Sequence, residues 1–183
     1  MPEPVVLLDR DGVINRDPGD ARYVMSRDDF HFVPRAQEAI ALLTRCGFRI
    51  YVISNQAGVG RGLFTGSTLQ SITGAMLSAV EQAGGRIEKV YYCTHKPEDN
   101  CSCRKPKPGL FEEIARSEGV SLSGSFFIGD SIRDVKAAHA AGCKAVLVLS
   151  GKETLENRDS WDEQPEHVFS DLYQAALFIT GKS

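Results

Sequence analysis

Short apolar runs and helical apolar patterns alternate along the 183-residue chain. Continuous apolar runs indicate strands that are buried on both faces, and they occupy residues 5–8, 48–53, 90–92, 125–128 and 144–149. Apolar residues at helical spacing predict helices, which cover residues 34–47, 67–83, 110–118, 135–142 and 172–179. This alternation predicts an open parallel α/β sheet with helices on both faces. A polar segment over residues 151–165 has no predicted element, and no insertion is long enough for a separate cap domain.

Composition and charge restrict the class of protein. With 42% hydrophobic and 25% charged residues, residues 1–183 suit one domain with a full core. The net charge of −3 provides no field for nucleic acid, so any phosphate-binding site must be local. No apolar run reaches the length of about 18 residues expected of a membrane span, and the N-terminus lacks the pattern of a signal peptide. We therefore expect a cytoplasmic monomer that binds neither nucleic acid nor membrane.

Two carboxylates follow the first predicted strand, in the sequence Asp9-Arg10-Asp11-Gly12. Residues i and i+2 of an extended chain point to the same side, so Asp9 and Asp11 are expected to share one pocket. Two anions repel each other unless a cation lies between them. Magnesium binds a few carboxylate oxygens and keeps positions for water and phosphate. The motif therefore predicts a magnesium site, whereas the alternative is a polar surface turn.

Polar side chains also follow the second and fourth predicted strands. The hydroxyl of Ser54 and nearby backbone N–H groups suit a phosphate oxygen, because they bind it without adding charge. Asp130 can complete the magnesium shell, and Asp134, one helical turn later, can orient bound water or Lys105. An acidic helix start is the alternative for one of these two aspartates. Because parallel strands end at the same edge of a sheet, we expect all these residues in one site.

Three cysteines and a histidine lie close together at Cys93, His95, Cys101 and Cys103. Three thiolates and an imidazole form the closed tetrahedral set that suits structural zinc. The chain has five cysteines, and such an odd number with this clustering favours metal over disulfides. The spacing matches no Cys-x-x-Cys finger, so clustered free cysteines are the alternative. We predict a zinc-binding loop at residues 93–103.

Two segments are assigned to substrate. Arg104 and Lys105 lie between the last zinc ligand and a proline, which restricts both side chains and suits them to phosphate; solvated surface charge is the alternative. The polar segment over residues 15–30 leaves the strand end that carries the first motif, so we assign it to the substrate rim. Asp17 and Asp20 in its predicted turn offer carboxylates to sugar hydroxyls, although an ordinary surface loop is equally compatible. The glycines of residues 57–66 match no nucleotide-binding fingerprint.

The four strand-end motifs resemble those of the haloacid dehalogenase-like phosphatases. Asp-x-Asp-Gly-Val at residues 9–13 matches the first motif, and Gly-Asp-x-x-x-Asp at residues 129–134 matches the fourth. Ser54 and Lys105 fit the second and third. The resemblance implies a Rossmann-like sheet, Asp9 as nucleophile, Asp11 as general acid and base, and a magnesium ion on Asp9, Asp11 and Asp130. It also implies that Lys105 stabilises the phosphoryl group during its transfer.

The chain also resembles one branch of this superfamily, in the histidinol-phosphatase-like subfamily. Residues 55–64 match the Asn-Gln-x-Gly-x-x-Arg-Gly-x-Phe stretch of the heptose bisphosphate phosphatases. This resemblance implies hydrolysis of the C7 phosphate of D-glycero-D-manno-heptose 1,7-bisphosphate, in the synthesis of ADP- or GDP-heptose for lipopolysaccharide. The substrate-binding residues expected from the whole reading are Asp17, Asp20, Asn55, Gln56, Arg104 and Ser131.

Three alternatives remain open. Histidinol-phosphate phosphatases share all four motifs and the cysteine loop, but resemble this chain less over residues 58–64. A zinc-stabilised binding module without turnover is disfavoured by the complete set of acid, hydroxyl and lysine. A polynucleotide 3′-phosphatase is disfavoured by the acidic charge balance.

Overall fold

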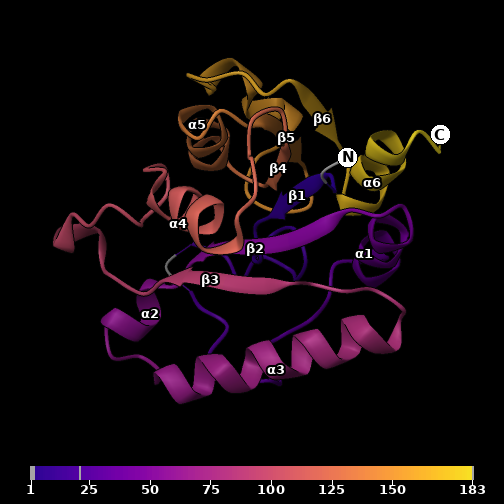
Figure 1. Cartoon of the computed structure of the whole chain (residues 1–183). Coiled ribbons are helices and arrows are strands. Elements are labelled where there is room, and N and C mark those ends of the chain that lie inside the picture. The colour runs from indigo at the N-terminus through magenta and orange to yellow at the C-terminus, as the bar shows by residue number, and fades with distance from the viewer. Residues whose placement is uncertain (1–2, 21, 183) are drawn as a thin grey trace.

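Six parallel strands form one open sheet in the computed structural model, which describes residues 3–20 and 22–182 (Figure 1). The strand order is β3-β2-β1-β4-β5-β6. The strands are β1 (Val5–Leu8), β2 (Arg49–Asn55), β3 (Lys89–Cys93), β4 (Phe126–Gly129), β5 (Lys144–Val148) and β6 (His167–Phe169). The first five confirm the predicted strands, whereas β6 was not predicted.

The helices lie between the strands as the apolar pattern predicts. The α-helices of the described residues are α1 (Ala36–Arg45), α2 (Ala57–Gly60), α3 (Gly66–Gln82), α4 (Gly109–Glu118), α5 (Ile132–Ala140) and α6 (Leu172–Thr180). Short 3₁₀ helices cover Pro97–Asp99 and Leu155–Ser160. One difference stands out: α2 lies in the glycine-containing segment over residues 57–66, for which no helix was predicted. Across the described residues no group of elements forms a separate cap domain.

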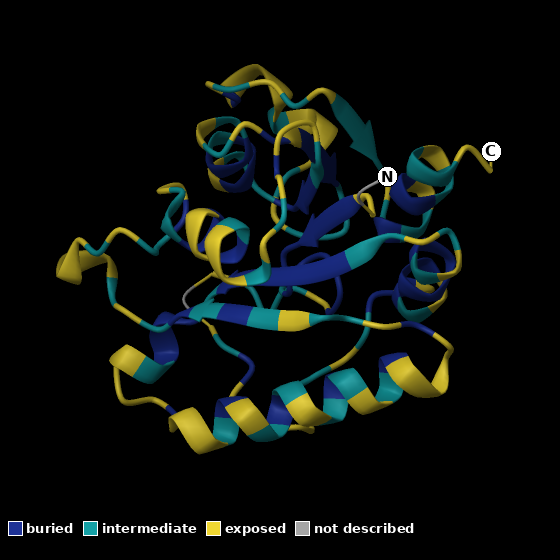
Figure 2. Cartoon of the chain, viewed as in Figure 1, coloured by how far each residue is buried: buried dark blue, intermediate teal, exposed yellow. Residues whose placement is uncertain are grey.

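The alternation of side chains along each strand divides the core into two layers. Val6 and Leu8 of β1 pack with residues of α1, α3 and α6 on one face. Val5 and Leu7 pack with α4 and α5 on the other face. Complete burial of each such side chain contributes about 1.5–3 kcal/mol. Figure 2 shows the resulting pattern, with central strands buried and the outer surface of α3 exposed.

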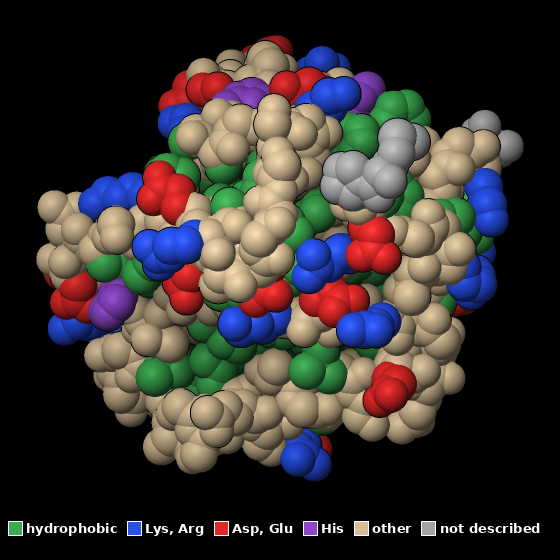
Figure 3. Space-filling view, in the orientation of Figure 1, with side chains coloured by type: hydrophobic (Ala, Val, Ile, Leu, Met, Phe, Trp, Pro, Cys, Tyr) green, Lys and Arg blue, Asp and Glu red, His purple; other side chains and the backbone are tan. Residues whose placement is uncertain are grey.

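Polar groups and charges lie on the outside of these layers. Figure 3 shows acidic and basic side chains interspersed over the visible face, without a broad patch of one sign. None of the described helices combines the length and apolar character needed to cross a bilayer.

The register of the central strands brings the predicted motifs together. Leu8 at the end of β1 pairs with Val52 of β2 and Ile128 of β4. The backbone N–H of Asp9 then donates to the Ile128 carbonyl over 2.9 Å. Asp9, Ser54 and Asp130 therefore lie one or two residues beyond this level, at the same edge of the sheet.

Candidate active site

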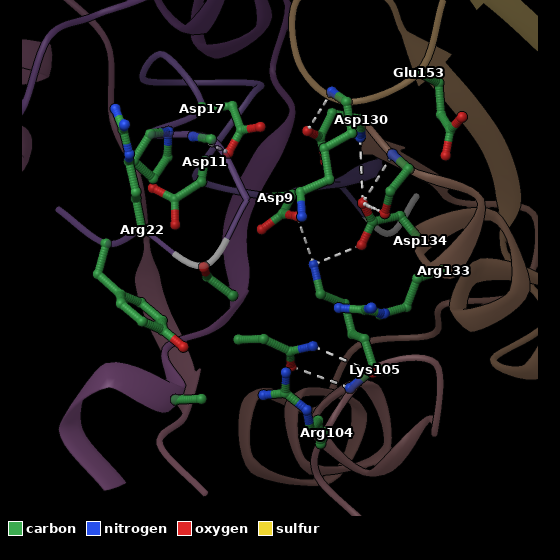
Figure 4. Close-up of a pocket in the computed structure, with 18 residues that line it drawn as sticks. Asp9, Asp11, Asp17, Arg22, Arg104, Lys105, Asp130, Arg133, Asp134 and Glu153 are labelled. Carbon is green, nitrogen blue, oxygen red and sulfur yellow. Dashed lines mark hydrogen bonds and ion pairs between the residues drawn. The ribbon is translucent and has the colours of Figure 1, made fainter. Parts of the chain in front are cut away.

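A cavity of about 300 Å³ opens where β1, β2 and β4 end (Figure 4). It collects residues from five separate parts of the chain, over residues 9–23, 54–57, 104–105, 130–134 and 152–153. The predicted site residues that line it are Asp9, Asp11, Asp17, Ser54, Asn55, Arg104, Lys105, Asp130, Ser131 and Asp134. Asp20 and Gln56 are predicted site residues that do not line it.

Lys105 lies at the centre of the site. Its Nζ is 2.8 Å from Asp9 Oδ2 and 2.7 Å from Asp134 Oδ1, and it donates to the Ile53 carbonyl over 3.2 Å. The side chain is 2% exposed. Burial opposes its charge, but Asp134 and Asp9 outweigh this effect and raise the pKa of Lys105. The ammonium group therefore remains charged at neutral pH, although water hardly reaches it.

Asp9, Asp130 and Asp134 form an acidic cluster whose carboxylate oxygens lie within 4.8 Å of one another. Burial and then the charges of Asp134 and Asp9 raise the pKa of Asp130 well above its ordinary value. Burial raises the pKa of Asp9 to about 7, although Lys105 acts in the opposite direction. Three carboxylates thus face one ammonium group. A divalent cation would bring the formal charge of the cluster to zero, and oxygen ligands suit magnesium.

Two glycines allow the backbone to approach this cluster closely. A Cβ on Gly12 or on Gly151 would lie 2.1 Å from Asp130 Oδ2. Gly12 also has a φ of +80°, a backbone conformation that residues with a side chain rarely adopt. The turn after β1 and the loop after β5 can therefore enclose Asp130 from two sides.

The Asp11 carboxylate lies in the cavity wall but outside the acidic cluster. Arg10 Nη2 is 2.9 Å from Asp11 Oδ1, and the side-chain amides of Asn15 and Gln56 donate to its two oxygens over 2.9 and 2.8 Å. Burial raises its pKa, but Arg10 and these hydrogen bonds prevail and lower it. We predicted the Asp11 carboxylate as a magnesium ligand, with Asp134 only in support. The structure instead places Asp134 in the cluster.

The residues after β2 support the site in different ways. Ser54 Oγ lines the cavity and accepts from Gln56 Nε2 over 2.9 Å. The side chain of Asn55 bonds both backbone groups of Lys105, over 3.1 and 3.2 Å. Gln56 is buried and was predicted to bind substrate, but the structure directs its amide N–H groups to Asp11 and Ser54.

The rim of the cavity combines acidic and basic side chains. Asp17 and Ser131 line it, while the side chain of Asp20 is fully exposed, with its Oδ1 3.7 Å from Lys152 Nζ. Arg133 and Arg104 both reach into the cavity beside Lys105 (Figure 4). Further lining residues that the sequence did not identify are Arg22, Tyr23, Arg133, Lys152 and Glu153. Arg133 had a signal because it lies within the fourth motif, and Arg22 and Tyr23 lie in the segment over residues 15–30 that was assigned to the substrate rim.

The cysteine cluster is assembled as a compact four-ligand set. The three sulfur–sulfur distances among Cys93, Cys101 and Cys103 are 3.1, 3.4 and 3.5 Å. His95 Nδ1 lies 3.2 Å from Cys103 Sγ and 3.8 Å from Cys93 Sγ. A tetrahedral zinc site with Zn–S bonds of about 2.3 Å has sulfur–sulfur edges of about 3.8 Å. The donor set and its compactness therefore fit zinc after a small expansion.

Known proteins are similar to this chain over nearly its whole length. A family model described as HAD-hydrolase-like matches residues 102–175. The D-glycero-beta-D-manno-heptose-1,7-bisphosphate 7-phosphatase of Neisseria meningitidis is 41% identical, with 96% of this chain and 94% of that protein covered. The D-glycero-D-manno-heptose-1,7-bisphosphate 7-phosphatase of Chlorobaculum tepidum is 40% identical, with 97% and 95% covered.

A solved structure shares the fold closely. The crystal structure of D,D-heptose 1,7-bisphosphate phosphatase from B. bronchiseptica, complexed with magnesium and phosphate, superimposes with a TM-score of 0.90. The two chains are 38% identical, and the alignment covers 98% of this chain and 99% of that one.

Proposed function

Because the chain belongs to the D-glycero-D-manno-heptose-1,7-bisphosphate 7-phosphatase family of haloacid dehalogenase-like hydrolases, we propose that it removes the C7 phosphate of that bisphosphate. The chain is a phosphoric monoester hydrolase. The observation that carries the proposal is Lys105, held between Asp9 and Asp134 at the floor of the cavity. We place the reaction in the synthesis of nucleotide-activated heptose for lipopolysaccharide, catalysed by one domain that spans the chain.

Asp9 is the nucleophile of the proposed reaction. One of its carboxylate oxygens attacks the phosphorus, the bond to the sugar oxygen breaks, and an aspartyl-phosphate forms. Its Oδ2 is paired with Lys105, and its Oδ1 accepts from the backbone N–H of Arg10 over 2.7 Å. These two contacts fix the carboxylate before the substrate arrives. Lys105 then stabilises the charge on the phosphoryl oxygens.

Asp11 moves the protons. It donates a proton to the departing sugar oxygen and later accepts one from the water that hydrolyses the aspartyl-phosphate. Without substrate its pKa is lowered, after the opposing effect of burial, by Arg10 and two side-chain amides. The negative charge of a bound phosphate favours the protonated form of Asp11. Substrate binding therefore favours the form of Asp11 that can donate a proton. Once the sugar has left, the carboxylate is available as the base.

Asp9, Asp130 and Asp134 would hold the magnesium ion. When bound, magnesium supplies the positive charge that offsets the phosphoryl oxygens. Asp130 is kept in place by the backbone N–H of Lys152, which donates to its Oδ2 over 3.0 Å. Asp134 accepts from Ser131 Oγ over 2.8 Å. These contacts leave the cluster ordered on the floor of the cavity.

Zinc would be held by Cys93, His95, Cys101 and Cys103 in a structural role. Arg104 and Lys105 follow the last of these ligands directly. Ordering this loop therefore places the two cations, which otherwise lose rotamer freedom when they bind phosphate.

Arg104 distinguishes the proposed substrate from a monophosphate. Lys105 is committed to the transferred phosphate, and Arg104 lines the same cavity. It supplies a second cation, which suits the other phosphate of a bisphosphate. On the rim Asp17 can accept hydrogen bonds from sugar hydroxyls. Histidinol phosphate has no second phosphate, so it would leave Arg104 unused.

The test compares kcat/KM for heptose 1,7-bisphosphate and for histidinol phosphate. We expect the bisphosphate to be the better substrate, with release of the C7 phosphate. Arg104→Ala should lower kcat/KM on the bisphosphate about tenfold, which corresponds to about 1.4 kcal/mol, and change a small monophosphate less. Arg116→Ala, on the exposed side of α4, is the matched control. A higher kcat/KM for histidinol phosphate would assign the chain to histidine synthesis instead.

A further inference from the structure

Arg10 lies between the two aspartates of the first motif, yet its side chain does not line the cavity. It is the largest fully buried side chain among the described residues. Its guanidinium forms a forked contact with Asp11: Nε is 3.1 Å from Oδ1, and Nη2 is 2.9 Å from Oδ1 and 3.2 Å from Oδ2. An unpaired buried guanidinium costs several kcal/mol. The pair with Asp11 therefore constrains both side chains.

Two buried amides complete the support of Asp11. Asn15 Nδ2 donates to Asp11 Oδ1 over 2.9 Å, and Gln56 Nε2 donates to Oδ2 over 2.8 Å. Asn15 is 0% exposed and Gln56 is 1% exposed. Each oxygen of Asp11 thus accepts both from Arg10 and from one amide. Rotation of the carboxylate would break several of these hydrogen bonds at once.

Arg10 also connects Asp11 to a distant strand. Its Cζ lies 5.9 Å from the centre of the Tyr92 ring in β3. The Tyr92 hydroxyl is 2.7 Å from Thr73 Oγ1 of α3, and Cys93 of the cysteine cluster is the next residue. The guanidinium therefore ties the turn after β1 to the edge strand and to the helix that packs against it.

We propose that Arg10 is a positioning residue for protonation of the leaving group, which rests on the proposed function. When the phosphorus–oxygen bond breaks, the electron pair stays on the sugar oxygen, and that oxygen takes the proton of Asp11. Arg10 forms and breaks no bond. It holds the Asp11 carboxylate at the cavity wall, so its loss affects leaving groups that need a proton more than those that do not.

The test uses Arg10→Met and Arg10→Lys with two substrates. 4-Nitrophenyl phosphate releases a stable phenolate, whereas heptose bisphosphate releases an alkoxide that needs a proton. We expect Arg10→Met to lower the single-turnover rate of sugar release about 10- to 100-fold, as for a displaced general acid. It should change the single-turnover rate of 4-nitrophenolate release and KM on the sugar less than about threefold. Arg10→Lys should recover part of the loss, because it keeps the charge but not the fork.

The controls distinguish a wrong role for Arg10 from a misfolded variant and from a wrong proposed function. Arg86→Met removes a surface arginine that is paired with Glu88, and it should change neither substrate. Gln56→Met removes another donor to Asp11, so it should also lower the rate of sugar release more than the rate of 4-nitrophenolate release. If circular dichroism shows that Arg10→Met is unfolded, Gln56→Met tests whether the support of Asp11 has this effect. Equal losses in the single-turnover rate of leaving-group release from both substrates would overturn the role of Arg10 while leaving the phosphatase function intact. A wild-type protein without activity on either substrate would instead refute the proposed function.

Discussion

Asp9→Asn should stabilise the magnesium-free fold while it removes turnover. Burial raises the pKa of Asp9 from 3.8 to about 7, with Lys105 opposing and Asp134 adding to the rise. A carboxyl group whose pKa is higher in the folded state destabilises the fold once it is ionised. The wild-type protein therefore loses stability as pH rises from about 4 to about 7. An amide at this position carries no charge and escapes that loss.

The size of the effect follows from the pKa. One pKa unit corresponds to about 1.4 kcal/mol, so the rise to about 7 costs the metal-free fold about 4 kcal/mol at pH 8. Asp9→Asn avoids this cost, but the variant also loses hydrogen-bond energy. Both oxygens of Asp9 accept hydrogen bonds, from Lys105 Nζ over 2.8 Å and from the Arg10 N–H over 2.7 Å, and an amide NH₂ would face one of these donors. Such a loss costs about 1–3 kcal/mol, which leaves a net gain of about 2 kcal/mol.

Urea unfolding followed by circular dichroism measures this gain. The protein is prepared in magnesium-free buffer with its zinc content checked, and the free energy of unfolding is compared at pH 8 and pH 5. The advantage of Asp9→Asn should shrink at pH 5, and saturating magnesium should stabilise the wild type more than the variant. Asp28→Asn, at an exposed position, is the control. A variant less stable than the wild type at pH 8 without magnesium would refute the electrostatic reasoning, and residual turnover would refute the nucleophile.

Three further predictions concern other parts of the molecule. Asp11→Asn should still form an aspartyl-phosphate from aryl phosphates but lose at least about 100-fold in kcat on sugar phosphates; equal loss on both in rapid-mixing assays would contradict its role. Cys101→Ser should lose bound zinc and several kcal/mol of stability together, and added magnesium should not restore activity; a zinc-free wild-type protein in metal analysis would contradict this. Hydrogen bonds that His139 donates to Glu163 and Glu166 raise its pKa despite burial, so its contribution to stability is present below about pH 6.5 and lost as pH rises further. His139→Gln should therefore cost about 1 kcal/mol at pH 6 and less at pH 9, and a loss that does not vary with pH would contradict the assignment.

The parts of the fold that the sequence predicts are those with a strong local pattern. β1 is apolar throughout, and β2 and β5 each contain an unbroken run of four apolar residues, because helices cover both faces of the sheet. The cavity follows from the same pattern, since polar residues after parallel strands meet at one edge. β6 lacks this signal. It has three half-buried residues at the edge of the sheet, too few to show a period.

The position of Asp11 outside the acidic cluster has a different cause. The prediction that Asp9 and Asp11 share a metal assumes that the strand continues through both residues. In the structure β1 ends at Leu8, and the Arg10 carbonyl accepts from the N–H groups of Ile14 and Asn15 over 2.8 and 3.1 Å. The chain therefore turns tightly after Asp9, and the two-residue repeat no longer sets the direction of Asp11. Only the folded turn shows that its partners are Arg10, Asn15 and Gln56.

The segment over residues 151–165 shows how far a wall of the site can lie from any chemical motif. Its pattern is polar and irregular, yet the backbone N–H groups of Lys152 and Glu153 donate to the side chain and the carbonyl of Asp130 over 3.0 and 3.1 Å. Trp161 anchors the segment, because it is 6% exposed in the core beside α5 and its Nε1 donates to Glu153 Oε2 over 3.2 Å. A single tryptophan in a polar stretch is the one local sign of this anchor, since so large an apolar side chain is rarely left in water. Packing of Trp161 in the core thus fixes the segment whose backbone N–H groups hold Asp130. The geometry of the acidic cluster therefore depends on packing that the spacing of the aspartates along the sequence does not show.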